Sequence, residues 1–170
     1  MERTLLLMRH SEAGFGITGS DIDRSLTHAG MADSRAAGTW LADEVGPVDL
    51  VLCSSSARTR QTWRGMTAGG ASGTEVSELE EIYDGGADDL LDLVHGIPDS
   101  VRTALVLGHS PGIPTLAHRL AADGSGADDT RRAFGHGFPT STIVRLAVDR
   151  SWIDLDAGQA DLVTVVTPRA

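Results

Sequence analysis

The chain has no lysine, although it is 170 residues long. Its 14 basic residues are all arginine and stand against 24 acidic residues, which gives a net charge of −10. Without lysine the protein has no P-loop lysine, no lysine Schiff base and no Ser-Lys dyad. The acidic balance also argues against nucleic acid as a partner.

Cysteine and long apolar runs are equally scarce. Cys53 is the only cysteine, which excludes an internal disulfide and a cysteine-rich zinc cage. The six histidines form neither an H-x-H nor an H-E-x-x-H pattern, so we expect no metal and no cofactor. No apolar run reaches membrane-spanning length and no signal peptide is recognisable. These absences predict a soluble cytoplasmic protein with no membrane partner.

Apolar stretches alternate with amphipathic stretches along the chain. Strands are expected at residues 4–8, 49–53, 75–76, 103–107, 141–148 and 162–166. Helices are expected at residues 28–45, 57–66, 88–95 and 111–121. Residues 122–138 are rich in Gly, Asp and Arg and are expected to form a mobile loop with one helical turn. The alternation predicts one α/β domain over residues 1–170, a three-layer α/β/α sandwich around a mostly parallel sheet.

Three of the predicted strands end in cationic side chains. Arg9 and His10 follow the first strand, Arg58 lies in a helical turn after the second, and His109 follows the third long apolar strand. Open α/β sheets keep their ligand sites at the carboxyl ends of the strands, so we expect these residues to meet. A guanidinium fork matches phosphoryl oxygens, and a neutral histidine nitrogen can attack phosphorus. The pattern predicts phosphoryl transfer through a phosphohistidine.

Two rival motifs point to other chemistry. Residues 108–112 read Gly-His-Ser-Pro-Gly and match the G-x-S-x-G nucleophile elbow of α/β-hydrolases. That mechanism needs the backbone N–H of the residue after the serine, and Pro111 has none, so a serine esterase acting through Ser110 stays a weak alternative. Cysteine phosphatases place five residues between cysteine and arginine, whereas four separate Cys53 from Arg58. This spacing excludes the cysteine mechanism.

Four motifs in order along the chain resemble those of the histidine phosphatase superfamily. They are residues 8–13 (Met-Arg-His-Ser-Glu-Ala), 24–30 (Arg-Ser-Leu-Thr-x-x-Gly), 54–62 and 108–109. The similarity runs from residue 4 to about residue 148, and the Arg-x-Leu-Thr element looks most similar to SixA-type phosphohistidine phosphatases. The resemblance implies a phosphoglycerate mutase-like fold and a metal-independent phosphatase.

The resemblance also implies roles for particular residues. His10 would be the phosphorylated nucleophile, and Arg9, Arg58 and His109 would hold the phosphoryl oxygens. Arg24 matches a basic position after the first loop and would assist in substrate binding.

Two positions are open within this resemblance. Ser11 stands where the family usually has glycine, and it would either crowd the backbone approach or add a hydrogen bond to the substrate. The general acid falls among residues 79–84, where Glu81 occupies the corresponding region and Glu80 and Asp84 compete with it. An imidazole leaving group would need no such acid.

The sequence leaves the substrate and the outcome of binding open. A phosphomonoester and a phosphoramidate present the same phosphoryl group, and the lack of a long insertion over the site favours a bulky substrate such as a phosphohistidine-bearing protein. The alternative is that the protein recognises phosphorylated molecules: it would bind a phosphoryl group in the same cationic pocket without hydrolysing it.

Overall fold

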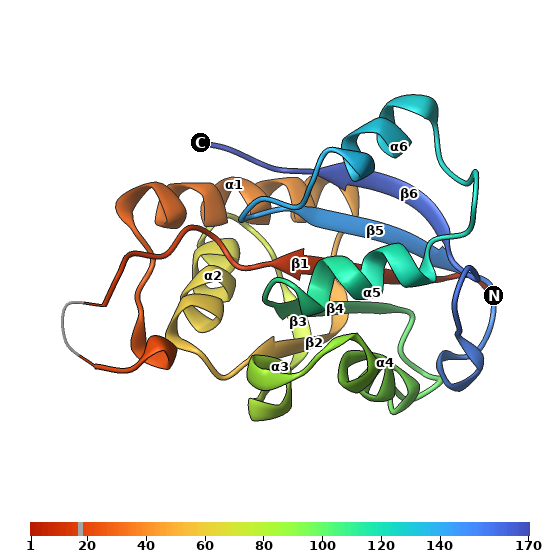
Figure 1. Cartoon of the computed structure of the whole chain (residues 1–170), viewed down its shortest axis with the longest axis horizontal. Helices are drawn as coiled ribbons and strands as arrows, with labels where there is room; N and C mark the ends of the chain where they lie inside the picture. The colour runs from red at the N-terminus through yellow and green to blue at the C-terminus, as the bar shows by residue number, and fades with distance from the viewer. Residues whose placement is uncertain (17–18) are drawn as a thin grey trace.

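A six-stranded sheet forms the middle of the molecule, with strand order β3-β2-β4-β1-β5-β6 (Figure 1). The structure is a computed structural model that describes residues 1–16 and 19–170. The strands are β1 (Arg3–Arg9), β2 (Val48–Ser54), β3 (Gly73–Leu79), β4 (Thr103–Gly108), β5 (Ile143–Val148) and β6 (Asp161–Val166). The first four strands are mutually parallel, and β5 is antiparallel to both β1 and β6. The predicted mostly parallel sheet is confirmed.

Helices cover both faces of this sheet and complete the three predicted layers. One face carries α1 (His28–Glu44) and α2 (Ala57–Ala68). The other carries α3 (Glu80–Asp84), α4 (Ala87–His95), α5 (Gly112–Leu120), α6 (Asp128–Gly135) and the short turn η2 (Trp152–Asp154). A further short turn, η1 (Asp21–Asp23), precedes α1. None of the helices in the described part of the chain combines the length and apolar character that a membrane span requires.

Alternate residues of the buried strands divide the core into two clusters. Leu5 and Leu7 of β1 face the cluster under α4 and α5, whereas Leu6 and Met8 face the cluster under α1 and α2. All four side chains are fully buried. A strand that is buried on both faces reads as an unbroken apolar run, which is why β1 is recognisable from the sequence.

Residues 122–138 differ from the expected loop, because α6 lies within them. Phe134 of α6 is 8% exposed and stacks on His118 of α5, with the ring centroids 3.9 Å apart. A single buried aromatic ring therefore anchors a helix that is otherwise polar. Such a helix lacks the apolar periodicity by which a sequence pattern reveals helices.

The motif at residues 24–30 attaches α1 to the loop that follows β1. The Thr27 side chain caps α1 by accepting from the Gly30 backbone N–H, and the Thr27 backbone N–H donates to the Glu12 carbonyl at 3.0 Å. A Cβ atom at position 30 would lie 2.0 Å from the Glu12 carbonyl oxygen. Only glycine permits this close approach.

Candidate active site

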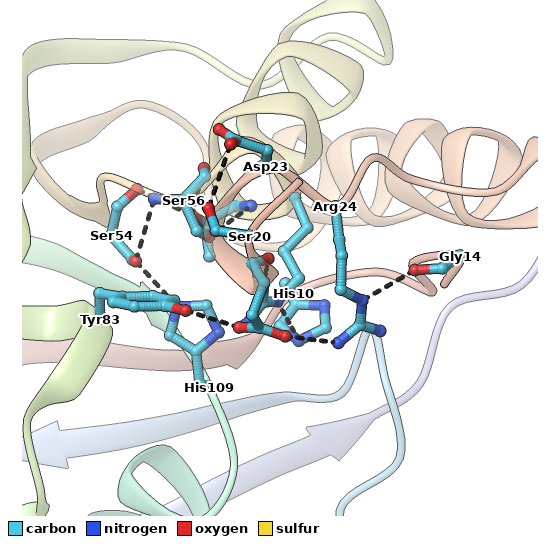
Figure 2. A network of polar contacts seen from close by, with 12 residues as sticks. His10, Gly14, Ser20, Asp23, Arg24, Ser54, Ser56, Tyr83 and His109 are labelled. Atoms are coloured by element: carbon cyan, nitrogen blue, oxygen red, sulfur yellow. Dashed lines mark hydrogen bonds and ion pairs between the residues drawn. The ribbon is translucent and has the colours of Figure 1, made fainter. Parts of the chain in front are cut away.

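The carboxyl ends of β1, β2 and β4 bring the predicted cationic residues together (Figure 2). The ring centroids of His10 and His109 lie 5.2 Å apart. The Nε atom of Arg58, from the first turn of α2, donates to Nε2 of His10 at 3.3 Å. The predicted convergence of three strand ends on one site is confirmed.

His10 is oriented by the backbone of the next residue. Its Nδ1 atom lies 2.7 Å from the Ser11 carbonyl oxygen, which can only accept a hydrogen bond. The proton therefore resides on Nδ1, and Nε2 keeps its lone pair. Burial lowers the pKa of His10 to about 4, and the charges of Arg58 and Arg9 act in the same direction. His10 is thus neutral near pH 7, and its unprotonated Nε2 accepts the hydrogen bond from Arg58.

His109 forms a hydrogen bond with Ser54. Its Nε2 atom lies 2.8 Å from the Ser54 hydroxyl oxygen, and that oxygen accepts from the Ser56 backbone N–H at 3.3 Å. This arrangement favours donation of the Ser54 proton to Nε2, with the ring proton of His109 on Nδ1. Burial, followed by the charge of Arg58, lowers the pKa of His109 to about 3. His109 is therefore a neutral donor.

Some donors of the site have no partner among the described residues. The Arg9 Nη1 atom donates to the Phe138 carbonyl at 3.0 Å, but its Nε atom is buried without a hydrogen bond. The Nδ1 atom of His109 is likewise buried and unpaired. Buried polar nitrogens without partners are rare in proteins, so these two are exceptions within the site.

Asp21 of η1 enters the site, and sequence reasoning missed it. Its Oδ2 atom accepts from the Tyr83 hydroxyl at 2.6 Å and from Nη2 of Arg58 at 3.1 Å, and its Oδ1 atom accepts from Nη1 of Arg24 at 2.9 Å. The Asp21 carbonyl also accepts from Nη1 of Arg58. These donors, Tyr83 first, hold the pKa of Asp21 well below its usual range. The one feature of the sequence that points to Asp21 is its position three residues before Arg24. Residues at that spacing in a helical turn can form an ion pair.

Tyr83, also missed by sequence reasoning, lies beside His109. The two rings meet edge to face with centroids 5.5 Å apart, and the Arg58 guanidinium carbon lies 5.7 Å from the Tyr83 ring centroid. Figure 2 shows Tyr83 and His109 together on one side of His10, with Arg24 on the other. The hydrogen bond from Tyr83 to Asp21 joins residues 62 positions apart, which no local pattern reveals.

The carboxyls of the acidic segment form no polar contact with the site residues that the structure describes. Within the described residues, no hydrogen bond or ion pair involves the side chain of Glu80, Glu81 or Asp84, and α3 presents Tyr83 to the site instead. Glu80 and Asp84 line a cavity next to Tyr83, but Glu81 does not. The role of Glu81 as general acid therefore stays a prediction, which no polar contact among the described residues supports.

Ser11 also has a different place from the one expected. Its side chain is fully buried, and its hydroxyl lies 2.7 Å from the hydroxyl of Ser141, which precedes β5. The backbone N–H of Ser11 donates to Thr62 of α2 at 3.0 Å. Ser11 therefore links three segments around His10 and does not reach the substrate with its hydroxyl.

The rival nucleophiles are not activated in this structure. Ser110 is exposed, and His109, which a serine esterase would need as its base, pairs with Ser54 instead. Cys53 is buried in β2, and burial raises the pKa of its thiol to about 12. Neither side chain can act as a nucleophile in this arrangement.

The charges in the site come from arginine. In the part of the chain that the structure describes, no three or more His, Cys, Asp or Glu side chains are arranged to hold a metal ion. The guanidinium groups of Arg9, Arg24 and Arg58 surround His10 and contribute to lowering its pKa. Such a constellation attracts an anion and repels a cation.

Known proteins share this sequence and architecture. The sequence model of the histidine phosphatase superfamily (branch 1) matches residues 5–97. Uncharacterized protein ML1117 of Mycobacterium leprae is 33% identical over 166 residues, covering 95% of this chain and 100% of that protein. The structure of SixA from Nakamurella multipartitia is 37% identical with a TM-score of 0.84, covering 100% of this chain and 98% of that one.

A second SixA structure, from Agrobacterium tumefaciens, is 25% identical with a TM-score of 0.76 and covers 98% of this chain and 99% of that one. Both SixA proteins are named for phosphohistidine phosphatase activity. The matches span the segments that carry His10, Arg58 and His109. The chain belongs to the histidine phosphatase superfamily and, within it, to the SixA type.

Proposed function

We propose that the protein is a phosphatase that takes the phosphoryl group of its substrate onto Nε2 of His10 and then passes it to water. The geometry of His10 supports this most directly. Its Nδ1 proton is held by the Ser11 carbonyl, and its Nε2 lone pair lies beside the Arg58 guanidinium. A neutral, oriented imidazole among arginines is a nucleophile placed next to an anion site.

The surrounding donors would hold the phosphoryl oxygens during transfer. Arg58, Arg9 and His109 would supply charge-assisted or neutral hydrogen bonds. Arg58 lies in the first turn of α2, where free backbone N–H groups also favour an anion. These groups replace the positive charge that a metal would bring to phosphoryl transfer.

The reaction would take place in two balanced steps. In the first, Nε2 of His10 forms a bond to phosphorus while the bond to the leaving group breaks, and the leaving group takes that electron pair. In the second, water attacks phosphorus, the bond to His10 breaks and returns the electron pair to Nε2, and the product leaves as dihydrogen phosphate with both protons of the water. Neutral histidine is regenerated for the next cycle.

A phosphohistidine-bearing protein is the substrate that we favour. The SixA proteins similar to this chain are named for that activity. Among the described residues, the carboxyls of Glu80, Glu81 and Asp84 form no hydrogen bond with the groups around His10, and an imidazole leaving group needs no proton from such a carboxyl.

Labelling with a phosphorylated histidine-containing protein tests this proposal. Wild type should release phosphate and carry an acid-labile, base-stable label, whereas His10→Ala should show neither. His28→Ala, an exposed histidine at the start of α1, is the matched control and should behave as wild type. Label on His109 or Ser110 would identify another nucleophile, and label without phosphate release would indicate a recognition protein.

A further inference from the structure

Among the described residues, Asp21 is the carboxylate that contacts the groups around both histidines. Its Oδ2 atom accepts a hydrogen bond from Arg58, which in turn donates to His10. The same oxygen accepts a hydrogen bond from Tyr83, whose ring packs against His109. The Asp21 side chain is 53% exposed, so it lies at the mouth of the site and remains accessible to an incoming molecule.

Asp21 is held in position from both sides. Nη1 of Arg24 donates to Oδ1, and Nε of Arg24 is anchored on the Gly14 carbonyl at 2.8 Å. Both terminal nitrogens of Arg58 reach Asp21, one at its carboxylate and one at its backbone carbonyl. The carboxylate is therefore a preorganised negative charge within a cationic pocket.

Asp21 has no proton to give to a leaving group near neutral pH. The hydrogen bonds from Tyr83, Arg24 and Arg58 hold the pKa of Asp21 below its usual range, so the carboxyl is ionised. The Tyr83 hydroxyl already donates to Asp21 at 2.6 Å, and this hydrogen bond raises the pKa of Tyr83, which makes the phenol a weaker acid. The site thus has an anion where an ester would need an acid.

We propose that Asp21 is a specificity-determining residue, whose carboxylate accepts a hydrogen bond from the protonated ring nitrogen of a phosphohistidine leaving group. The assignment rests on the proposed function of His10. A charge-assisted hydrogen bond of this kind is among the stronger polar contacts in proteins. It selects substrates whose leaving group brings its own proton.

The proton balance explains the selection. In protonated phosphohistidine one ring nitrogen bears phosphorus, the other bears hydrogen, and the ring is a cation. When His10 attacks, the P–N electron pair returns to the ring nitrogen, and the imidazole leaves neutral with its hydrogen in place. An alkyl ester would instead leave as an alkoxide, which needs a proton that an ionised Asp21 cannot give.

Asp21→Asn tests the proposal, because it removes the charge and nearly preserves the shape. The two substrates are a phosphohistidine peptide and p-nitrophenyl phosphate, whose phenolate leaves without a proton. The ratio of kcat/KM for the peptide to that for the aryl ester should fall about tenfold to a hundredfold, as expected for losing a hydrogen bond to a charged group. The loss should shrink at pH values above the pKa of the peptide's ring, where the substrate has no proton to offer.

Asp23→Asn is the matched control. Asp23 lies on the same turn, and its carboxylate pairs with Ser20 at 3.1 Å. This variant should leave the selectivity ratio and its pH dependence unchanged.

An equal loss for both substrates in Asp21→Asn, independent of pH, would show that Asp21 only positions Arg58 and would overturn the inference. Failure of the proposed function looks different: wild type would then carry no label on His10 with either substrate. In that case the assignment of Asp21 falls with it.

Discussion

At the residue scale, the contribution of the hydrogen bond between Ser54 and His109 to turnover can be measured with single variants. His109→Ala should slow turnover by roughly two to three orders of magnitude, as for the loss of one donor to a developing charge, while some labelling of His10 remains. Ser54→Ala should cause a smaller loss, because it only frees Nε2 of His109 from the hydroxyl 2.8 Å away.

The double variant Ser54→Ala/His109→Ala shows whether Ser54 affects turnover by positioning His109 or independently of it. If Ser54 acts through His109, adding Ser54→Ala to His109→Ala should slow turnover little further. Full additivity of the two losses in single-turnover kinetics would contradict the pairing.

The two site histidines should also make stability depend on pH. Burial lowers the pKa of His10 to about 4 and that of His109 to about 3, against 6.5 for an ordinary histidine. Between about pH 6.5 and pH 4 the unfolded chain therefore binds more protons than the folded one, and acid favours unfolding. The low pKa of Asp21 acts in the same direction, but only below the usual range of an aspartate.

The free energy of unfolding should fall by at most about 1.4 kcal/mol per pH unit for each histidine as the pH drops through this window. Urea unfolding at several pH values measures it. His109→Asn should flatten the dependence, whereas His28→Asn should not. An unchanged slope in His109→Asn would show that its folded pKa is not depressed.

At the scale of elements, the contact between α1 and α2 determines where Arg58 stands. A Cβ atom at Gly38 of α1 would lie 2.0 Å from the Met66 carbonyl oxygen of α2. We expect Gly38→Ala to push the helices apart and to lower the free energy of unfolding by about 1–3 kcal/mol, the usual cost of overpacking.

Gly135→Ala is the control for that substitution. Gly135 ends α6, and among the described residues no atom lies within 4 Å of the place that a Cβ would take there, so the change should be nearly neutral. Urea unfolding compares the two variants, and phosphatase activity of Gly38→Ala reports on Arg58. Equal stability of both variants would mean that the helices separate without cost.

At the scale of the whole molecule, a strongly acidic protein gathers arginine side chains around His10. The net charge is −10, yet Arg9, Arg24 and Arg58 gather around His10. Vanadate or phosphate should therefore raise Tm, by an amount equivalent to about 2.7 kcal/mol at a hundredfold excess over Kd. Arg58→Ala should abolish most of this shift.

The same reasoning predicts no dependence on metal. Activity and the Tm shift with vanadate should persist in excess EDTA, because arginine supplies the positive charge in the proposed mechanism. Loss of activity in EDTA that a divalent ion restores would refute the metal-independent mechanism. Thermal unfolding and phosphate release on the same samples provide both readouts.

The sequence by itself determined the central strands and the cationic side chains that follow them. A strand buried on both faces is an unbroken apolar run, so β1, β2 and β4 are visible in one dimension. The residues directly after them, including His10 and His109, must then lie at one edge of a parallel sheet. These inferences need only neighbours in the chain and one rule of sheet topology.

Only the tertiary structure decided which polar groups complete the site. Asp21 and Tyr83 are 62 positions apart, Ser54 and His109 are 55 apart, and Ser11 and Ser141 are 130 apart. Their types are common in loops and caps, so nothing local distinguishes them. The helix α6 was missed for a related reason, since its one apolar anchor, Phe134, acts through packing on α5. Hydrogen bonds and ring contacts act over a few ångströms in space, and only the folded chain brings these residues within that range.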